Sequence, residues 1–150
     1  MIDKNGIEIR TGDVVEITGA YFKNDNGLYF VSRSAGDAGW CGNYYSLHKI
    51  SKTGKISKAS GASRSWPIAI YTNDYMKRIE GNAWNAEHAT IEVKTGINQK
   101  YIAEHFRQAA EALDARIEYE IYNYGEESEC TKLTKSVKSH FISVADRITV

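Results

Sequence analysis

The sequence is poor in proline and cysteine, carries no net charge and has no long apolar run, and each absence excludes a class of protein. Its 150 residues include one proline and two cysteines, Cys41 and Cys130, which form no Cys-x-x-Cys pair. No apolar run approaches the roughly 18 residues that a membrane-spanning helix needs. The polar opening, residues 1–10, contains no apolar signal core, so we expect no secretory peptide. These features predict a cytoplasmic protein with two free thiols.

Charge is balanced overall but unevenly distributed along the chain. Residues 38–73 carry five basic side chains and no acidic one, whereas residues 74–130 carry six basic and twelve acidic groups. A dedicated nucleic-acid-binding domain usually has a clear basic excess, because phosphate contacts supply most of its affinity. The sequence therefore favours either two solvated segments that partly neutralise each other or a bipolar surface that docks onto a charged partner.

The hydrophobic pattern indicates an α+β protein. Strand patterns, separated by turn residues, cover residues 7–10, 13–18, 27–33, 44–50, 55–59, 66–71 and 89–94. The first five of these segments predict a small antiparallel, SH3-like barrel over residues 1–65. An α+β region over residues 66–150 is expected to pack on this barrel or to form a single domain with it.

The second half of the chain contains helix signals and one ambiguous segment. Residues 98–114 carry a single apolar stripe and predict the clearest helix, and a weaker helix is expected over roughly residues 74–87. Residues 115–124 alternate apolar and polar side chains and predict a strand. Residues 131–150 fit a helical stripe, but their content of β-branched residues favours a strand.

Residues 12–31 resemble the KOW motif of small SH3-like barrels. The shared features are Gly12-Asp13, an alternating apolar strand, and Gly19 and Gly27 around an aromatic and basic turn. The resemblance implies an SH3-like barrel, a fold whose members bind RNA, DNA, peptides and proteins. Residues 24–26 are Asn-Asp-Asn where the motif is usually basic, which argues against RNA contact at this turn.

Residues 10–30 and 82–94 also resemble small proteins carried by mobile elements of gut Gram-positive bacteria. This resemblance implies an accessory or anti-defence role, in which the protein occludes a host nucleic-acid-processing enzyme by direct contact, as anti-restriction and anti-CRISPR proteins do. The acidic stretch from Glu111 to Glu129 would then mimic or block a nucleic-acid channel.

The sequence shows no constellation that supports catalysis or a cofactor. Cys41 lies in a glycine-rich loop seven residues before His48, a pairing that would suit a cysteine hydrolase. A strand pattern follows Cys41, however, and no Asn or Asp is obviously placed to orient His48, so the hydrolase is our third hypothesis. The histidines lack metal-ligand spacing, and the glycine-rich loop lacks the lysine-serine ending of a phosphate cradle. We therefore predict no enzyme, no cofactor and no metal.

The candidate binding residues are aromatic, basic and acidic. Seven aromatic rings fall within residues 21–45, and strand alternation sends them to both faces, of which only one can fill a barrel core. Exposed Tyr and Trp are common in protein interfaces and also stack on bases. The predicted contact residues are Tyr21, Tyr29, Trp40, Tyr44, Lys49, Lys52, Lys55, Lys58, Glu118, Glu120, Glu126 and Glu127. We favour a protein partner; the alternative is a KOW-like nucleic-acid binder that uses the lysines and tyrosines.

Overall fold

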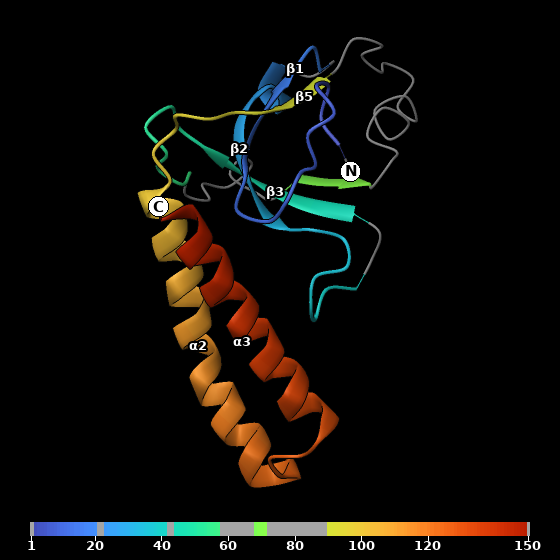
Figure 1. Cartoon of the computed structure of the whole chain (residues 1–150), viewed down its shortest axis with the longest axis vertical. Coiled ribbons are helices and arrows are strands. Elements are labelled where there is room, and N and C mark those ends of the chain that lie inside the picture. Colours follow the sequence, from blue (N-terminus) through green and yellow to red (C-terminus); the bar gives the residue numbers. More distant parts are fainter. Residues whose placement is uncertain (1, 21–22, 42–43, 58–67, 72–89, 150) are drawn as a thin grey trace.

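The protein is α+β, as predicted, with a five-stranded sheet and two long helices (Figure 1). This computed structural model describes residues 2–20, 23–41, 44–57, 68–71 and 90–149. The strands are β1 (Val14–Thr18), β2 (Gly27–Arg33), β3 (Tyr44–Ile50), β4 (Ile68–Tyr71) and β5 (Thr90–Val93). The helices are η1 (Lys23–Asp25, a 3-10 turn), α2 (Lys100–Tyr124) and α3 (Glu129–Ile148). The helix predicted over residues 74–87 lies outside the described residues.

The sheet is antiparallel throughout, in the order β4-β3-β2-β1-β5. The strand predicted over residues 7–10 is reduced to a single bridge, Ile2 with Glu8, and the described part of the strand predicted over residues 55–59 contains one bridge, Ile50 with Ile56. In the described part of the chain, the edge strands β4 and β5 do not pair with each other. The sheet is therefore not closed, and the predicted SH3-like barrel is not confirmed. Strands from both sides of residue 65 take part in this one sheet.

The alternation of side chains along the strands builds two separate apolar clusters. On one face of the sheet, Val15, Ile17, Tyr29 and Val31 pack with other apolar side chains of the strands and loops. The residues between them point to the opposite face, where Phe30 packs against both long helices. Tyr29, predicted as a contact residue, is thus fully buried and belongs to the core.

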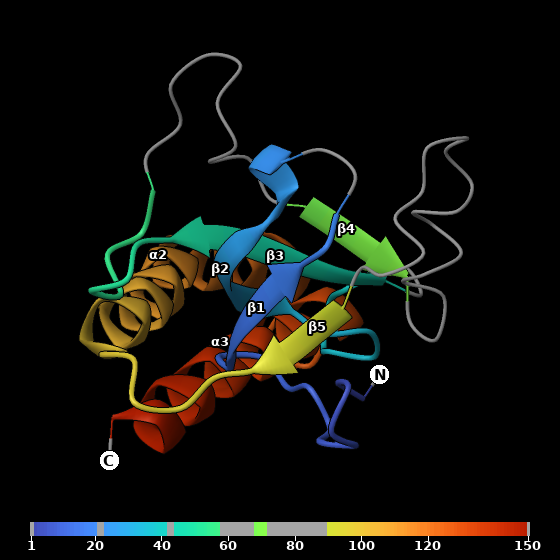
Figure 2. The same ribbon diagram turned by 90° about the horizontal axis from the view of Figure 1, so that it is seen from above.

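Only one end of the helical pair packs against the sheet. Ile102 and Phe106 of α2, together with Phe141 and Val144 of α3, share a cluster with Phe30. From there the helices run away from the sheet as an antiparallel hairpin, and the views in Figures 1 and 2 agree on this arrangement. Beyond Ala110, α2 continues for 14 residues, or about 20 Å at 1.5 Å per residue. The turn between the helices is therefore the part of the hairpin furthest from the sheet.

The strand predicted over residues 115–124 is wrong, because this segment is helical. For residues 131–150 the sequence left helix and strand open and favoured a strand, whereas the structure has a helix up to Ile148. In α3 the buried side chains recur at helical spacing, from Thr131 and Thr134 through Val137 to Phe141 and Val144. A side chain that packs against a neighbouring helix gains more from burial than the modest cost of its β-branched shape in a helix. The side chain of Ser128 also accepts a hydrogen bond from the Thr131 N–H and thereby caps the helix.

Two glycines allow the loops of the sheet to approach α3 closely. Gly12 has a φ of +92°, and a Cβ at this position would lie 2.7 Å from Val144 Cγ1. Gly39 has a φ of +73°, and its Cβ would lie 2.7 Å from Val137 Cγ2. Both positions combine a backbone conformation that favours glycine with a contact that leaves no room for a side chain.

We expect Gly12→Ala to destabilise the fold, through backbone strain and overpacking, by about 2–4 kcal/mol. Gly36 is a matched control, because it has a similar positive φ but nothing within 4 Å of a Cβ. Gly36→Ala should cost only the backbone part, about 1–2 kcal/mol. Urea denaturation of the three proteins measures both values. Equal losses for the two variants would contradict the close contact with α3.

Candidate functional site

The predicted aromatic surface on the sheet is not assembled by the described residues. Tyr29 is buried, and its hydroxyl donates a hydrogen bond to the Asp25 carbonyl at 2.9 Å. Trp40 is half-buried, with the Arg33 guanidinium 5.6 Å from its ring. Tyr21 and the side chain of Tyr44 lie outside the described residues. The aromatic residues that the structure does describe here therefore support the fold.

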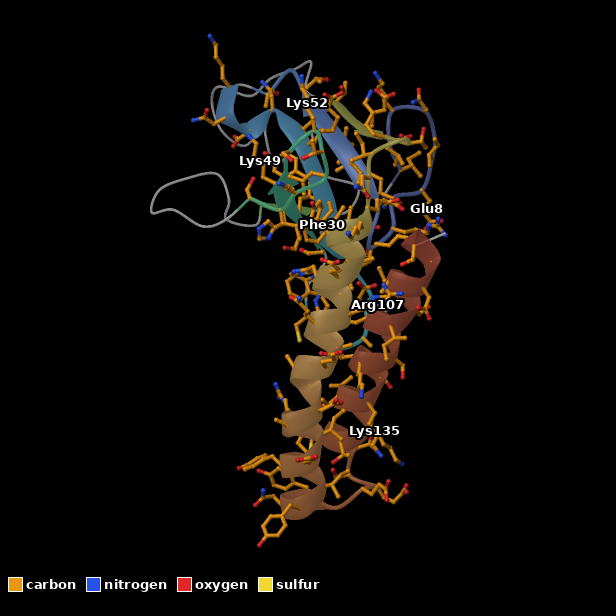
Figure 3. All side chains as sticks on the ribbon, turned by 90° about the vertical axis from the view of Figure 1, so that its left-hand side faces the viewer. Glu8, Phe30, Lys49, Lys52, Arg107 and Lys135 are labelled. Atoms are coloured by element: carbon orange, nitrogen blue, oxygen red, sulfur yellow. The ribbon has the colours of Figure 1, made fainter. Side chains whose placement is uncertain are left out.

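The predicted basic residues have different surroundings. Lys49 donates hydrogen bonds to the carbonyls of Asn24 and Asn26, at 2.8 and 3.1 Å, so it holds the turn before β2 (Figure 3). The Lys55 ammonium lies 5.9 Å from the Tyr101 ring centroid, where a cation–π contact is favourable. Lys52 is exposed, and Lys58 lies outside the described residues. Of the three predicted lysines that the structure describes, Lys52 is thus the one that faces solvent without such a contact.

The proposed pair of Cys41 and His48 also has separate surroundings. Cys41 is an exposed thiol in the loop after β2. The His48 ring stacks on Phe30 with centroids 5.5 Å apart, and His48 Nε2 lies 3.3 Å from the Ser57 carbonyl oxygen. His48 is therefore part of the contact between the sheet and α2.

A polar cluster joins the loop after β2 to α3. Asp37 Oδ2 accepts hydrogen bonds from the Thr11 hydroxyl at 2.6 Å and from the Ser34 N–H at 3.0 Å, and it lies 3.1 Å from His140 Nε2. These groups line a cleft of about 310 Å³ between the N-terminal segment and α3. The Thr11 hydrogen bond holds the loop to the N-terminal segment, the Ser34 hydrogen bond lies within the loop, and the short distance to His140 places the loop beside α3.

The end of the helical hairpin exposes three tyrosines. The exposed fractions of Tyr119, Tyr122 and Tyr124 are 60%, 89% and 60%. The rings of Tyr119 and Tyr124 lie edge to face, with centroids 6.4 Å apart. Tyr119 also raises the pKa of Tyr124, by its charge and by a hydrogen bond between the two side chains. Two of the three rings therefore contact each other while both remain exposed.

Acidic residues lie beside these tyrosines, and two of the four predicted ones form ion pairs with α3. Glu126 lies 3.2 Å from Lys135 Nζ and Glu127 lies 3.4 Å from Lys132 Nζ, both in exposed ion pairs that contribute about 0–1 kcal/mol each. Glu118 is exposed. Together with the tyrosines, these carboxylates form what we call the hairpin tip, residues 118–127.

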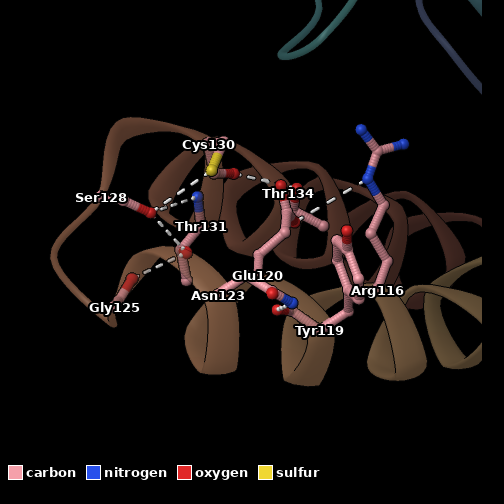
Figure 4. Close-up of polar contacts among 9 residues, drawn as sticks. All are labelled: Arg116, Tyr119, Glu120, Asn123, Gly125, Ser128, Cys130, Thr131 and Thr134. Atoms are coloured by element: carbon pink, nitrogen blue, oxygen red, sulfur yellow. Dashed lines mark hydrogen bonds and ion pairs between the residues drawn. The ribbon is translucent and has the colours of Figure 1, made fainter.

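Glu120 departs from the prediction, because its side chain is buried between the two helices rather than exposed (Figure 4). Its Oε1 atom has no hydrogen-bond partner, and the nearest cation, Arg116 Nε, is 3.8 Å away. The hydroxyls of α3 that lie nearby are used elsewhere: Thr131 donates to the Gly125 carbonyl and Thr134 to the Cys130 carbonyl, each at 3.0 Å. Helical spacing places Glu120 on the inner side of α2, whereas the predicted strand left it on the wet face.

The tyrosines of the hairpin tip are absent from the contact residues predicted from the sequence. The segment 118–124 reads Glu-Tyr-Glu-Ile-Tyr-Asn-Tyr, and its alternation was interpreted as a half-buried strand. As a helix, the same letters place Tyr119 and Tyr122 three residues apart on one face. These tyrosines would have been predicted as exposed if the helix starting at residue 98 had been continued past residue 114, because they then lie on its outward face.

No family model, curated protein or solved structure matches this chain. The KOW-like and mobile-element resemblances therefore stay predictions. None of the helices in the described ranges combines the length and the apolar character needed to cross a membrane. Within the same ranges, no group of three or more His, Cys, Asp or Glu side chains could hold a metal ion.

We expect the stability of the protein to depend on pH through His105, which lies on α2 against Phe30 of the sheet. Burial lowers the pKa of His105, and the neighbouring His48 lowers it further. The folded state therefore favours neutral His105. Its contribution to stability is fully present above the ordinary value of 6.5 and is lost as the pH falls below that value through the folded pKa.

We expect the thermal midpoint of the wild type to fall by a few degrees more than that of His105→Phe between about pH 7.5 and about pH 5. A phenyl ring suits the site, because His105 already lies edge-on to Phe30 and Phe106. Scanning calorimetry at the two pH values measures the difference. Parallel pH profiles for both proteins would show that His105 does not couple folding to protonation.

Proposed function

We propose that this chain is a non-enzymatic binding protein that acts by protein–protein contact and that the hairpin tip is its contact surface. The observation that carries the proposal is the exposure of Tyr119, Tyr122 and Tyr124 at the end of the molecule furthest from its core. Tyrosine supplies a large, rigid contact area at a low cost in side-chain entropy, which is why it is enriched in interfaces.

The shape of the molecule supports the same proposal. The sheet and the near ends of the helices share an apolar cluster, so the fold does not need the outer half of the hairpin for its core. That outer half is nevertheless a regular pair of helices with its own cap at Ser128. A rigid projecting arm with aromatic side chains at its end can enter a groove of a partner without disturbing the sheet.

The finer part of the proposal concerns the partner. Residues 111–130 contain seven acidic side chains and one basic side chain. A nucleic-acid-processing enzyme presents a basic channel, which is complementary to such a surface. We therefore propose an accessory or anti-defence protein that occludes an enzyme of this kind. The ion pairs with Lys132 and Lys135 reduce the net charge of the hairpin tip, so the tyrosines rather than bulk charge supply most of the binding energy.

To test this proposal, the immobilised chain is used to capture proteins from a nuclease-treated bacterial lysate, followed by quantitative mass spectrometry. We expect Tyr119→Ser combined with Tyr122→Ser to reduce capture of specific partners by about tenfold or more, because hot-spot residues each contribute at least that much. Ile142→Ser is the matched control, since Ile142 is also an exposed apolar residue but lies on α3 nearer the sheet. Unchanged capture by the tyrosine variant would contradict the proposal.

The competing hypothesis, a nucleic-acid binder using the lysines, predicts a different result. Titration of the chain with single- and double-stranded DNA and RNA would then show binding that weakens steeply with salt. That binding would be lost in Lys52→Glu combined with Lys58→Glu and retained in the tyrosine variant. Such an outcome would show that the binding surface is formed by the lysines of residues 49–58 and not by the hairpin tip.

A further inference from the structure

The buried carboxylate of Glu120 is the feature of the hairpin tip that folding does not explain. Its side chain is 6% exposed, and its Oε1 has no hydrogen-bond partner in the structure. Burying a charge whose nearest counter-ion is too far away for a hydrogen bond costs stability, and replacing such a group by an uncharged one often stabilises a protein. A neutral residue at this position would therefore fold better.

The surroundings of Glu120 indicate what kind of group could donate a hydrogen bond to its carboxylate. The hydroxyls of Thr131 and Thr134 on α3 donate to backbone carbonyls rather than to Glu120. Arg116 approaches Oε1 from one turn earlier on α2, but its Nε is 3.8 Å away, beyond hydrogen-bond distance, and its side chain is 70% exposed. A guanidinium thus already points toward this carboxylate without forming the bond. Among the described residues, the Arg116 guanidinium has no polar contact besides the one with Glu120.

Resting on the proposed function, we propose that Glu120 receives an arginine side chain of the partner protein, flanked by the tyrosines of the hairpin tip. The incoming guanidinium takes the place of Arg116 and donates to the carboxylate, while the Tyr119 and Tyr124 rings offer their faces to the same cation. Arginine fits better than lysine, because its planar fork can bind a carboxylate with two parallel bonds and stack on an aromatic ring. Exposed Glu118 adds favourable charge at the rim.

The test uses fluorescein-labelled nona-arginine and nona-lysine peptides, titrated into the full chain by fluorescence anisotropy. We expect nona-arginine to bind more tightly than nona-lysine of equal charge. Glu120→Gln keeps the size of the side chain and should weaken nona-arginine binding by about tenfold or more. Glu111→Gln is the matched control, an exposed carboxylate on the same helix nearer the sheet, and should change binding less than about twofold.

A stability measurement separates loss of binding from loss of fold. Glu120→Gln should unfold at the same temperature as the wild type or higher, because it removes a buried charge. A second variant, at Arg116, tests whether this residue competes with the incoming arginine for Glu120. Arg116→Gln should strengthen nona-arginine binding, whereas Arg107→Gln, which removes the same charge closer to the sheet, should leave it nearly unchanged.

Each result decides between this inference and the broader proposal. Equal affinities for the two peptides, or an unchanged affinity in Glu120→Gln, would overturn the arginine site. If the partners captured from lysate bind Glu120→Gln as well as the wild type but fail to bind the tyrosine variant, the hairpin tip is a docking surface without this contact. If peptide binding follows Glu120 but no protein is captured through the tyrosines, the arginine site stands and the proposed function fails.

Discussion

The contact of three phenylalanines between the sheet and the helices is the constraint on which the rest of the structure depends. Phe106 of α2 lies 5.9 Å from Phe30 of the sheet and 5.9 Å from Phe141 of α3, all three being buried. Aromatic pairs in such tilted and edge-to-face arrangements contribute about 0.5–1.5 kcal/mol each beyond their burial. One ring comes from the sheet and one from each helix, so this contact joins all three parts of the fold.

The strands that form the sheet were largely predictable, because a half-buried strand shows its period of two in a short stretch of residues. The end of α2 was not predictable from local sequence, since Ile117, Tyr119 and Ile121 alternate with polar residues as in a strand, and the helix that pairs with α2 comes later in the chain. The open sheet and the burial of Tyr29 likewise depend on contacts between distant segments. Local periodicity therefore predicted the sheet, while the position of the candidate site depended on how the helices pair.

The hairpin tip combines features that a chain selected for stability alone would not keep. It exposes Tyr122 almost completely and buries Glu120 without a hydrogen bond to Oε1. The same end of the hairpin is well made in other respects, with the Ser128 cap and the Thr131 hydroxyl bond to Gly125. Unfavourable groups within an otherwise well-formed segment are typical of sites at which stability is given up for recognition.

The spacing of the buried positions of α3 implies that the length of the helical hairpin can change independently of its contact with the sheet. From Thr134 to Phe141 the inward-facing residues repeat after seven positions, the spacing at which two packed helices return to the same relative orientation. Seven residues inserted into each helix would lengthen the arm by about 10 Å and leave the contact with the sheet in register. A helical hairpin of a different length, with a different sequence at its tip, is therefore compatible with the same sheet and the same contact between the sheet and the helices.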